Sequence, residues 1–135
     1  ILNNSNSYIK YFENIKKRKV HNPSFEELVN FLKSDNTDKK TYDYNNYNCF
    51  HFSKQLNKNA EEVGIRCGLV EISMDGKIPH AITVFKTKDK GKVFVEPQTD
   101  DIITLKAGKD YWKECLPSGE DHGPGWIIKS ISIYW

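Results

Sequence analysis

The chain has 135 residues, of which 38% are hydrophobic and 28% are charged, and its formal net charge is +2. This length is enough for one domain with a core of ordinary size. The composition is too apolar for a disordered chain and too polar for a membrane protein, and the small net charge gives little support to nucleic-acid binding. We expect one soluble globular domain, with no nucleic-acid partner and no segment inserted directly into a membrane.

The N-terminal part of the sequence predicts an arm followed by a domain. Residues 1–20 are rich in Asn, Ser and Lys and carry a dense basic run at 16–19, which is typical of a solvated surface. We interpret 1–20 as a polar arm or helix and 21–135 as the domain. Because the chain begins at Ile1 rather than at Met, we expect that it was trimmed from a longer precursor or excised from a larger protein, so that an export signal or anchor could have been removed. The sequence leaves the location open, with an extracellular or cell-surface domain favoured.

A first helix of the domain is predicted just after the arm. Ser24 can cap this helix, and Glu27, three residues later, can complete a capping box, so a short helix should extend to about Lys33. Residues 34–46 are polar and have no hydrophobic period, which is typical of a loop. This loop leads directly into the segment that contains Cys49.

The segment after the loop predicts a helix that begins at Cys49. Apolar residues recur at steps of three or four from 49 to 63, and Gly64 stands where a helix commonly ends. A thiol on the first turn lies at the positive end of the helix dipole and near unpaired backbone N–H groups, which favour a thiolate and can bind an oxyanion. The alternative is that Cys49 is a small core residue, as free cysteines often are.

Beyond this helix the hydrophobic period changes to two, which indicates strands joined by tight turns. The pattern predicts strands at 66–74, 81–87, 92–96, 100–105 and 126–135, with a helical turn at 109–115. The first three strands should form an antiparallel meander. Together these elements predict an α+β fold in which N-terminal helices pack on an antiparallel sheet.

Residues suited to one kind of catalysis stand at the ends of these elements. His80 comes at the start of the second predicted strand, and the third strand ends in Glu96. A cysteine hydrolase or acyltransferase needs a thiolate, an imidazole that takes and returns its proton, and a group that orients the ring. Cys49, His80 and Glu96 are candidates for these roles. A histidine at the end of a strand can equally have a structural role.

The register of the predicted hairpin offers a second candidate for the orienting group. If residues 89–91 form a three-residue loop, His80 lies opposite Asp100, with Gln98 beside it. A bulge at the start of the strand would instead bring Glu96 to His80. The orienting group is therefore Glu96 or Asp100, and either acid can also be a plain surface carboxylate.

The order of these residues resembles a known family. The segments that carry the resemblance are Tyr47-Asn48-Cys49, Phe52-Ser53, Gly64-Ile65-Arg66-Cys67, His80-Ala81 and Val95-Glu96-Pro97. They resemble the nucleophile helix, the His-Ala strand and the Asp-Pro strand end of transglutaminase-like cysteine enzymes. The resemblance implies a papain-like fold with Cys49 as nucleophile, His80 as base and then acid, and Glu96 in place of the usual aspartate.

The resemblance also implies an activity. It is acyl transfer to water or to an amine through a thioester on Cys49, at an amide or peptide bond of a protein or peptide substrate. This chemistry requires no metal or organic cofactor, and no EF-hand-like run of calcium ligands is present. The backbone N–H of Cys49 and a group from Tyr47 or the preceding loop would bind the oxyanion. Tyr47, Gln98 and Asp100 are candidate substrate-binding residues.

A non-catalytic interpretation competes with the enzyme. An inactive transglutaminase-like domain could keep the fold and bind a peptide, a glycan or a partner protein at a cell surface. A zinc site is not expected, because Cys49 and His51 point to different sides of a helix and no second close pair of ligands accompanies them.

The other cysteines and aromatic residues are interpreted as structural. In an exported protein, Cys67 and Cys115 are expected to form a disulfide and to leave Cys49 as the odd thiol. The Gly- and Pro-rich segment 119–125 predicts an exposed turn around His122 rather than a lid over a cleft. The remaining aromatic residues of interest are predicted to lie in the core or on its rim, and they are Tyr111, Trp112 and Trp126.

Overall fold

A computed structural model describes Lys10 and residues 19–135, so most of the predicted arm lies outside the described residues. The helices are α2 (Phe25–Ser34) and α3 (Cys49–Glu62), with a 3-10 turn η1 (Thr37–Lys39) between them and a π-helical turn η2 (Tyr111–Cys115). The strands are β1 (Gly68–Met74), β2 (His80–Thr87), β3 (Gly91–Glu96), β4 (Asp101–Ile103) and β5 (Ile128–Tyr134). Each helix and strand predicted between residues 21 and 135 is present, with ends shifted by a few residues.

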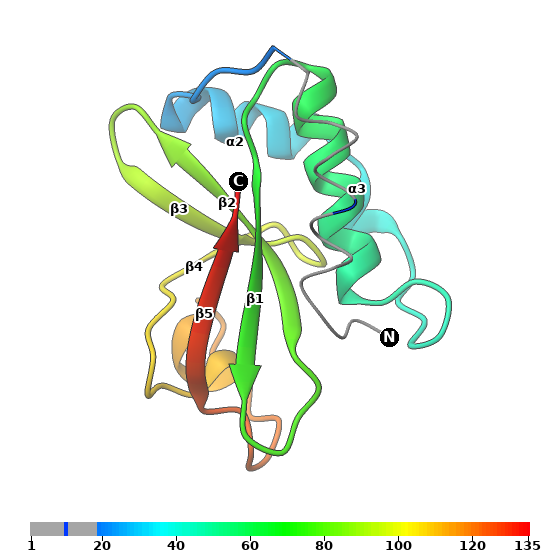
Figure 1. Cartoon of the computed structure of the whole chain (residues 1–135), viewed down its shortest axis with the longest axis vertical. Helices are drawn as coiled ribbons and strands as arrows, with labels where there is room; N and C mark the ends of the chain where they lie inside the picture. Colours follow the sequence, from blue (N-terminus) through cyan, green and yellow to red (C-terminus); the bar gives the residue numbers. More distant parts are fainter. Residues whose placement is uncertain (1–9, 11–18) are drawn as a thin grey trace.

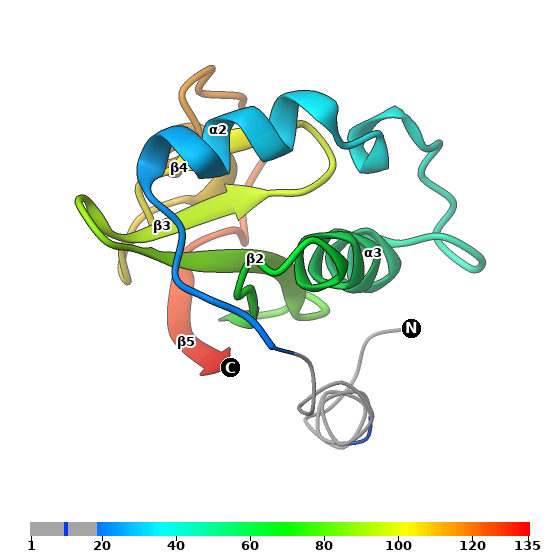
Figure 2. The same ribbon diagram turned by 90° about the horizontal axis from the view of Figure 1, so that it is seen from above.

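The strands form one antiparallel sheet in the order β4-β3-β2-β1-β5. Helices α2 and α3 pack on one face of this sheet and η2 packs on the other, as Figures 1 and 2 show. The expected α+β fold with N-terminal helices on an antiparallel sheet is confirmed at this level. Among the described residues, no helix combines the length and the apolar character needed to cross a membrane.

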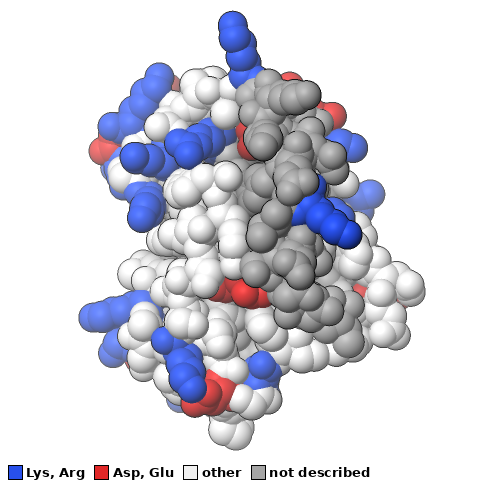
Figure 3. Space-filling view, in the orientation of Figure 1, with Lys and Arg blue, Asp and Glu red and all other residues white. Residues whose placement is uncertain are grey.

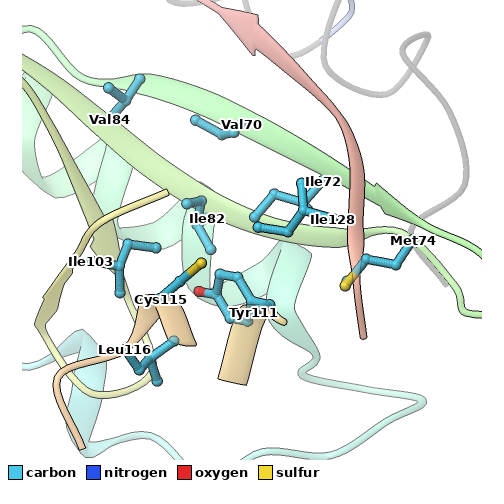
Figure 4. Close-up of a cluster of buried hydrophobic side chains, with 10 residues drawn as sticks. All are labelled: Val70, Ile72, Met74, Ile82, Val84, Ile103, Tyr111, Cys115, Leu116 and Ile128. Carbon is cyan, nitrogen blue, oxygen red and sulfur yellow. The ribbon is translucent and has the colours of Figure 1, made fainter. Parts of the chain in front are cut away.

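The sheet separates two hydrophobic clusters. The cluster on the helical side joins α2 and α3 to alternate residues of the strands, and it includes Cys67. The cluster on the other side joins Tyr111 and Cys115 of η2 to Ile72, Ile82 and other sheet residues (Figure 4). Because Cys67 and Cys115 lie in different clusters on opposite faces, and both are free thiols, the expected disulfide between them is wrong.

Side-chain caps fix where the two helices begin. The Ser24 hydroxyl accepts the backbone N–H of Glu27 at 3.0 Å, so the predicted N-cap of α2 is confirmed. Asn48 caps α3 by accepting the N–H of Phe50 at 3.1 Å, while its own N–H donates to Nδ1 of His51 at 3.1 Å. This reciprocal capping box makes Cys49 the first residue of α3.

The register of the β2–β3 hairpin differs from the predicted one. The loop consists of residues 88–90, so Thr87 pairs with Gly91 and Lys86 with Lys92. Gly91 takes a φ of 67°, a positive value that glycine adopts without steric cost. Continued along the strands, this register puts His80 opposite residue 98 instead of Asp100, so the predicted facing pair of His80 and Asp100 is wrong.

The same register places Glu96 on the diagonal from His80. Both side chains point to the η2 side of the sheet, because residues two apart on a strand share a face. A diagonal neighbour lies within reach of a long side chain. No bulge between β2 and β3 is therefore needed to bring Glu96 to the histidine.

The free end of this hairpin is rich in lysine. Lys86, Lys88, Lys90 and Lys92 are all exposed. Figure 3 shows Lys and Arg side chains gathered at the end of the molecule where the hairpin lies. These charges stand in solvent at the end of the hairpin, away from His80 at the other end of β2.

Candidate functional site

A buried histidine–carboxylate pair joins the start of β2 to the end of β3. Nε2 of His80 lies 2.6 Å from Oε1 of Glu96, and the two residues are 7% and 0% exposed. Such a short contact between a ring nitrogen and a carboxylate oxygen is typical of a charge-assisted hydrogen bond. The structure therefore puts Glu96, and not Asp100, on the imidazole.

The Glu96 carboxylate is held by two further donors. The Tyr111 hydroxyl donates to Oε1 at 2.8 Å, and the backbone N–H of Gln98 donates to Oε2 at 3.2 Å. A buried carboxylate is tolerated when its oxygens receive such bonds and a cation lies beside it. The three donors fix the orientation of Glu96 and, through it, the plane of the His80 ring.

This environment stabilises the protonated form of His80. Burial alone would lower the pKa of the ring, but the Glu96 carboxylate and hydrogen bonds with Cys49 and Glu96 outweigh it and raise the pKa to about 10. Because Nε2 is engaged by Glu96, Nδ1 is the ring nitrogen left for the Cys49 thiol. His80 thus connects the carboxylate to the cysteine in the order that a catalytic triad requires.

Cys49 is the accessible thiol among the three cysteines. It is half-buried at the first position of α3, where a backbone N–H has no partner inside the helix. Cys67 and Cys115 are 1% and 3% exposed, and burial raises the pKa of both thiols. A reactive cysteine needs exposure and a favourable charge environment, and Cys49 has both.

Cys49 and His80 open into a cleft with a volume of about 610 Å³. One wall comes from the loop before α3, a second from the β1–β2 connection, and a third from η2 and the loop that follows it. The lining consists of Tyr42, Tyr44, Asn48, Cys49, Gly76, Lys77, Ile78, Pro79, His80, Gln98, Trp112, His122 and Trp126. The cleft is large enough to receive a side chain and the bond next to it.

The three candidate substrate-binding residues have different positions. Gln98 lines the cleft, whereas Tyr47 and Asp100 are not part of its lining. The Tyr47 ring packs against Phe52 with ring centroids 4.8 Å apart. Asp100 lies near Asp35 and Asp38, and burial together with these two acids raises its pKa to about 7. Of the three, only Gln98 shares the lining of the cleft with Cys49.

The aromatic side chains around the cleft have more specific positions than the sequence indicated. Tyr111 is the core residue that holds Glu96, and nothing in its spacing from Glu96 predicts that contact. Trp112 stacks on His122 with ring centroids 4.4 Å apart, and the Trp126 indole N–H donates to the His122 carbonyl at 3.0 Å. His122 is exposed, as expected, but it also lines the cleft, so its loop forms one wall of the site.

Within the described part of the chain, no group of three or more His, Cys, Asp or Glu side chains is arranged to hold a metal ion. Neither the protein-family models nor the curated proteins compared with this chain give a match. The assignment of this site therefore depends on its own geometry.

Proposed function

We propose that the protein is a transglutaminase-like cysteine hydrolase or acyltransferase of the papain-like fold, which acts on an amide or peptide bond. The observation that carries this proposal is the buried Glu96–His80 pair, whose ring faces Cys49 at the start of a helix and beside an open cleft. A purely structural histidine would need the carboxylate but not the exposed thiol.

The first half of the reaction forms a thioester. The Cys49 thiolate attacks the carbonyl carbon of the substrate, and a carbon–sulfur bond forms as the carbonyl oxygen takes the negative charge. When the carbon–nitrogen bond breaks, the proton on His80 passes to the leaving amine. The amine departs as a neutral molecule and the acyl group remains on the sulfur.

The second half returns the enzyme to its starting state. Water or a second amine attacks the thioester carbon and gives its proton to His80, and the carbon–sulfur bond breaks to release the Cys49 thiolate. Glu96 keeps the ring oriented and stabilises its charged form in both halves, and it does so from a 0% exposed position. The reaction involves no oxidation or reduction and needs no metal or organic cofactor.

Two groups are proposed to bind the oxyanion. One is the backbone N–H of Cys49, which has no partner inside the helix. The other is the side-chain amide of Gln98, because Gln98 lines the cleft and its backbone is bonded to the Glu96 carboxylate. Asn48 is less suited, since its amide already bonds to Tyr44 and Phe50.

The experiment that tests this proposal is acylation of Cys49 by p-nitrophenyl acetate. We expect a burst of p-nitrophenol and a mass increase of one acetyl group on the peptide that contains Cys49. Cys49→Ala should remove the burst, whereas Cys115→Ala, which changes a buried thiol outside the cleft, is the matched control. If the reagent labels Cys67 or Cys115 first and leaves Cys49 unmodified until the protein is denatured, the binding-module interpretation is favoured.

A further inference from the structure

Large apolar side chains stand in water at the mouth of the cleft. Tyr42, Tyr44 and Ile78 are 47%, 46% and 46% exposed, and all three line the cleft that contains Cys49. Single exposed apolar residues are normal on a protein surface, but a group of them around one cavity indicates a surface that binds an apolar partner. Trp112 and Trp126 add to this apolar lining.

The aromatic wall is already in place before any substrate binds. Trp112 lies between His80, at 5.3 Å between ring centroids, and His122, on which it stacks at an interplanar angle of 11°. Trp126 stands at 83° to Trp112, and its indole N–H is bonded to the His122 carbonyl. A preformed wall binds an apolar group without the entropy cost of ordering its own side chains.

The charges around the cleft are unfavourable for a cation. Among the residues that the structure describes, no Asp or Glu belongs to its lining, and Lys77 contributes a positive charge. His80 is itself held in the protonated form by Glu96, whose carboxylate is fully buried and out of reach. A positively charged substrate side chain would therefore meet the charges of Lys77 and His80, and no carboxylate of the described lining.

The two tryptophans of the lining offer a substrate cation only part of their ring faces. Trp and Tyr rings can bind a cation, but Nζ of Lys77 already lies 4.4 Å from the Trp126 ring centroid. Gly125 makes room for this contact, because a Cβ at that position would come within 2.7 Å of Cε of Lys77. One face of Trp112 is covered by His122. The protein's own side chains thus occupy faces that a substrate cation would need.

We infer that the cleft selects an acyl donor whose side chain next to the reacting carbonyl is neutral and either aromatic or large and aliphatic. This inference rests on the proposed function and specifies its substrate class. Burying one such side chain should raise kcat/KM about 10- to 100-fold over alanine at the same position. A lysine at that position should react no faster than alanine.

The test uses p-nitrophenyl esters of N-acetyl-Phe, N-acetylnorleucine, N-acetyl-Ala and N-acetyl-Lys. p-Nitrophenyl acetate, which has no side chain, measures the reactivity of the Cys49 thiol itself. Norleucine and lysine differ mainly in the terminal charge. We expect the rate constants for Cys49 acylation to be highest for the Phe and norleucine esters, lower for the alanine ester and lowest for the lysine ester. If the lysine ester acylates Cys49 as fast as the norleucine ester or faster, while the acetate ester also acylates Cys49, the inferred selectivity is wrong and the proposed function stands. If no ester acylates Cys49, both are wrong.

Two variants locate the selectivity in the cleft. Trp126→Ala should reduce the ratio of the acylation rate constants of the Phe and Ala esters about tenfold. Lys77→Glu should raise the corresponding ratio of the Lys and norleucine esters by a similar factor at low salt. Lys77 is exposed, so its charge can be reversed without disturbing the core. Trp135→Ala and Lys86→Glu alter an exposed tryptophan and an exposed lysine outside the lining, and both ratios should stay unchanged. Equal effects of cleft and control variants would contradict the inference.

Discussion

Glu96 and Asp100 flank one tight turn, in which the Glu96 carbonyl accepts the backbone N–H of Asp100 at 2.8 Å, yet their carboxylates have opposite environments. Glu96 is completely buried and receives bonds from His80, Tyr111 and the Gln98 N–H. Asp100 has a buried Oδ1 without a hydrogen-bond partner in the described part of the chain. Burial, together with the neighbouring acids Asp38 and Asp35, raises the pKa of Asp100 to about 7.

The difference shows what a buried carboxylate needs in order to act on a histidine. Glu96 receives hydrogen bonds from His80, Tyr111 and the backbone of Gln98, whereas the buried Oδ1 of Asp100 has no partner among the described residues. The two acids stand at either end of the same turn, but the register of the hairpin puts only Glu96 on the diagonal from His80. The donors around the Glu96 carboxylate then hold it in place for contact with His80.

Removing the charge of Glu96 should have the largest effect. Glu96→Gln keeps the shape of the side chain but leaves the buried His80 without its counter-ion, so we expect kcat/KM to fall at least about 100-fold. Breaking a buried pair typically destabilises a protein by about 3–5 kcal/mol. Ester hydrolysis and urea unfolding near pH 7 measure the two effects. Glu96→Asp, which keeps the charge, should lose less stability; equal losses would mean that the charge is not what matters.

The pH dependence of stability should reveal the same pair. Below about pH 6.5, the ordinary pKa of histidine, His80 is protonated in both the folded and the unfolded protein, and the pair contributes fully. Between that value and about 10 only the folded protein keeps the proton, so the free energy of unfolding should decrease as the pH rises. Urea unfolding across this range measures the slope. In Glu96→Gln the His80 contribution to this slope should disappear, because burial alone lowers the pKa of the ring.

The Tyr111 hydroxyl should have a smaller effect than the charge. Tyr111→Phe removes one hydrogen bond to a buried carboxylate and keeps the ring, so the expected loss is about 1.5–3 kcal/mol of stability. Activity should fall by roughly tenfold or less, because two other donors still hold Glu96. Tyr47→Phe is the matched control, since the buried Tyr47 hydroxyl has no partner among the described residues. A Tyr47 variant as unstable as the Tyr111 variant would contradict this account.

Much of this arrangement could be predicted from local patterns. The recurrence of apolar residues every three or four positions predicted a helix that begins at Cys49, and their recurrence at every second position predicted the strands. The choice of Glu96 over Asp100 came from the resemblance to transglutaminase-like enzymes, because the assumed hairpin register was displaced. Thr87 explains the displacement, since its hydroxyl bonds to Lys90 and Gly91 and closes the loop one residue earlier than assumed.

Contacts between distant segments could not be predicted in this way. Tyr111 reaches Glu96 across the face of the sheet, and no periodicity relates the two positions. The number of cysteines suggested a bridge between Cys67 and Cys115, but only the three-dimensional structure shows that the sheet lies between them. The walls of the cleft are likewise assembled from three separate segments, which the sequence does not order in space.

The smallest expected effect concerns Asp100, where the substitution should stabilise the protein instead of destabilising it. The pKa of Asp100 is raised to about 7 in the folded protein, so folding binds a proton between about pH 4 and 7 and stability decreases as the pH rises through that range. Asp100→Asn removes the charge and should therefore make the protein slightly more stable than wild type at pH 8, with no gain at pH 4. Asparagine also tolerates the φ of 63° at this position. Thermal unfolding at the two pH values measures the effect, and ester hydrolysis should be unchanged. A destabilised or inactive Asp100→Asn would show that this carboxylate, and not Glu96 alone, supports the site.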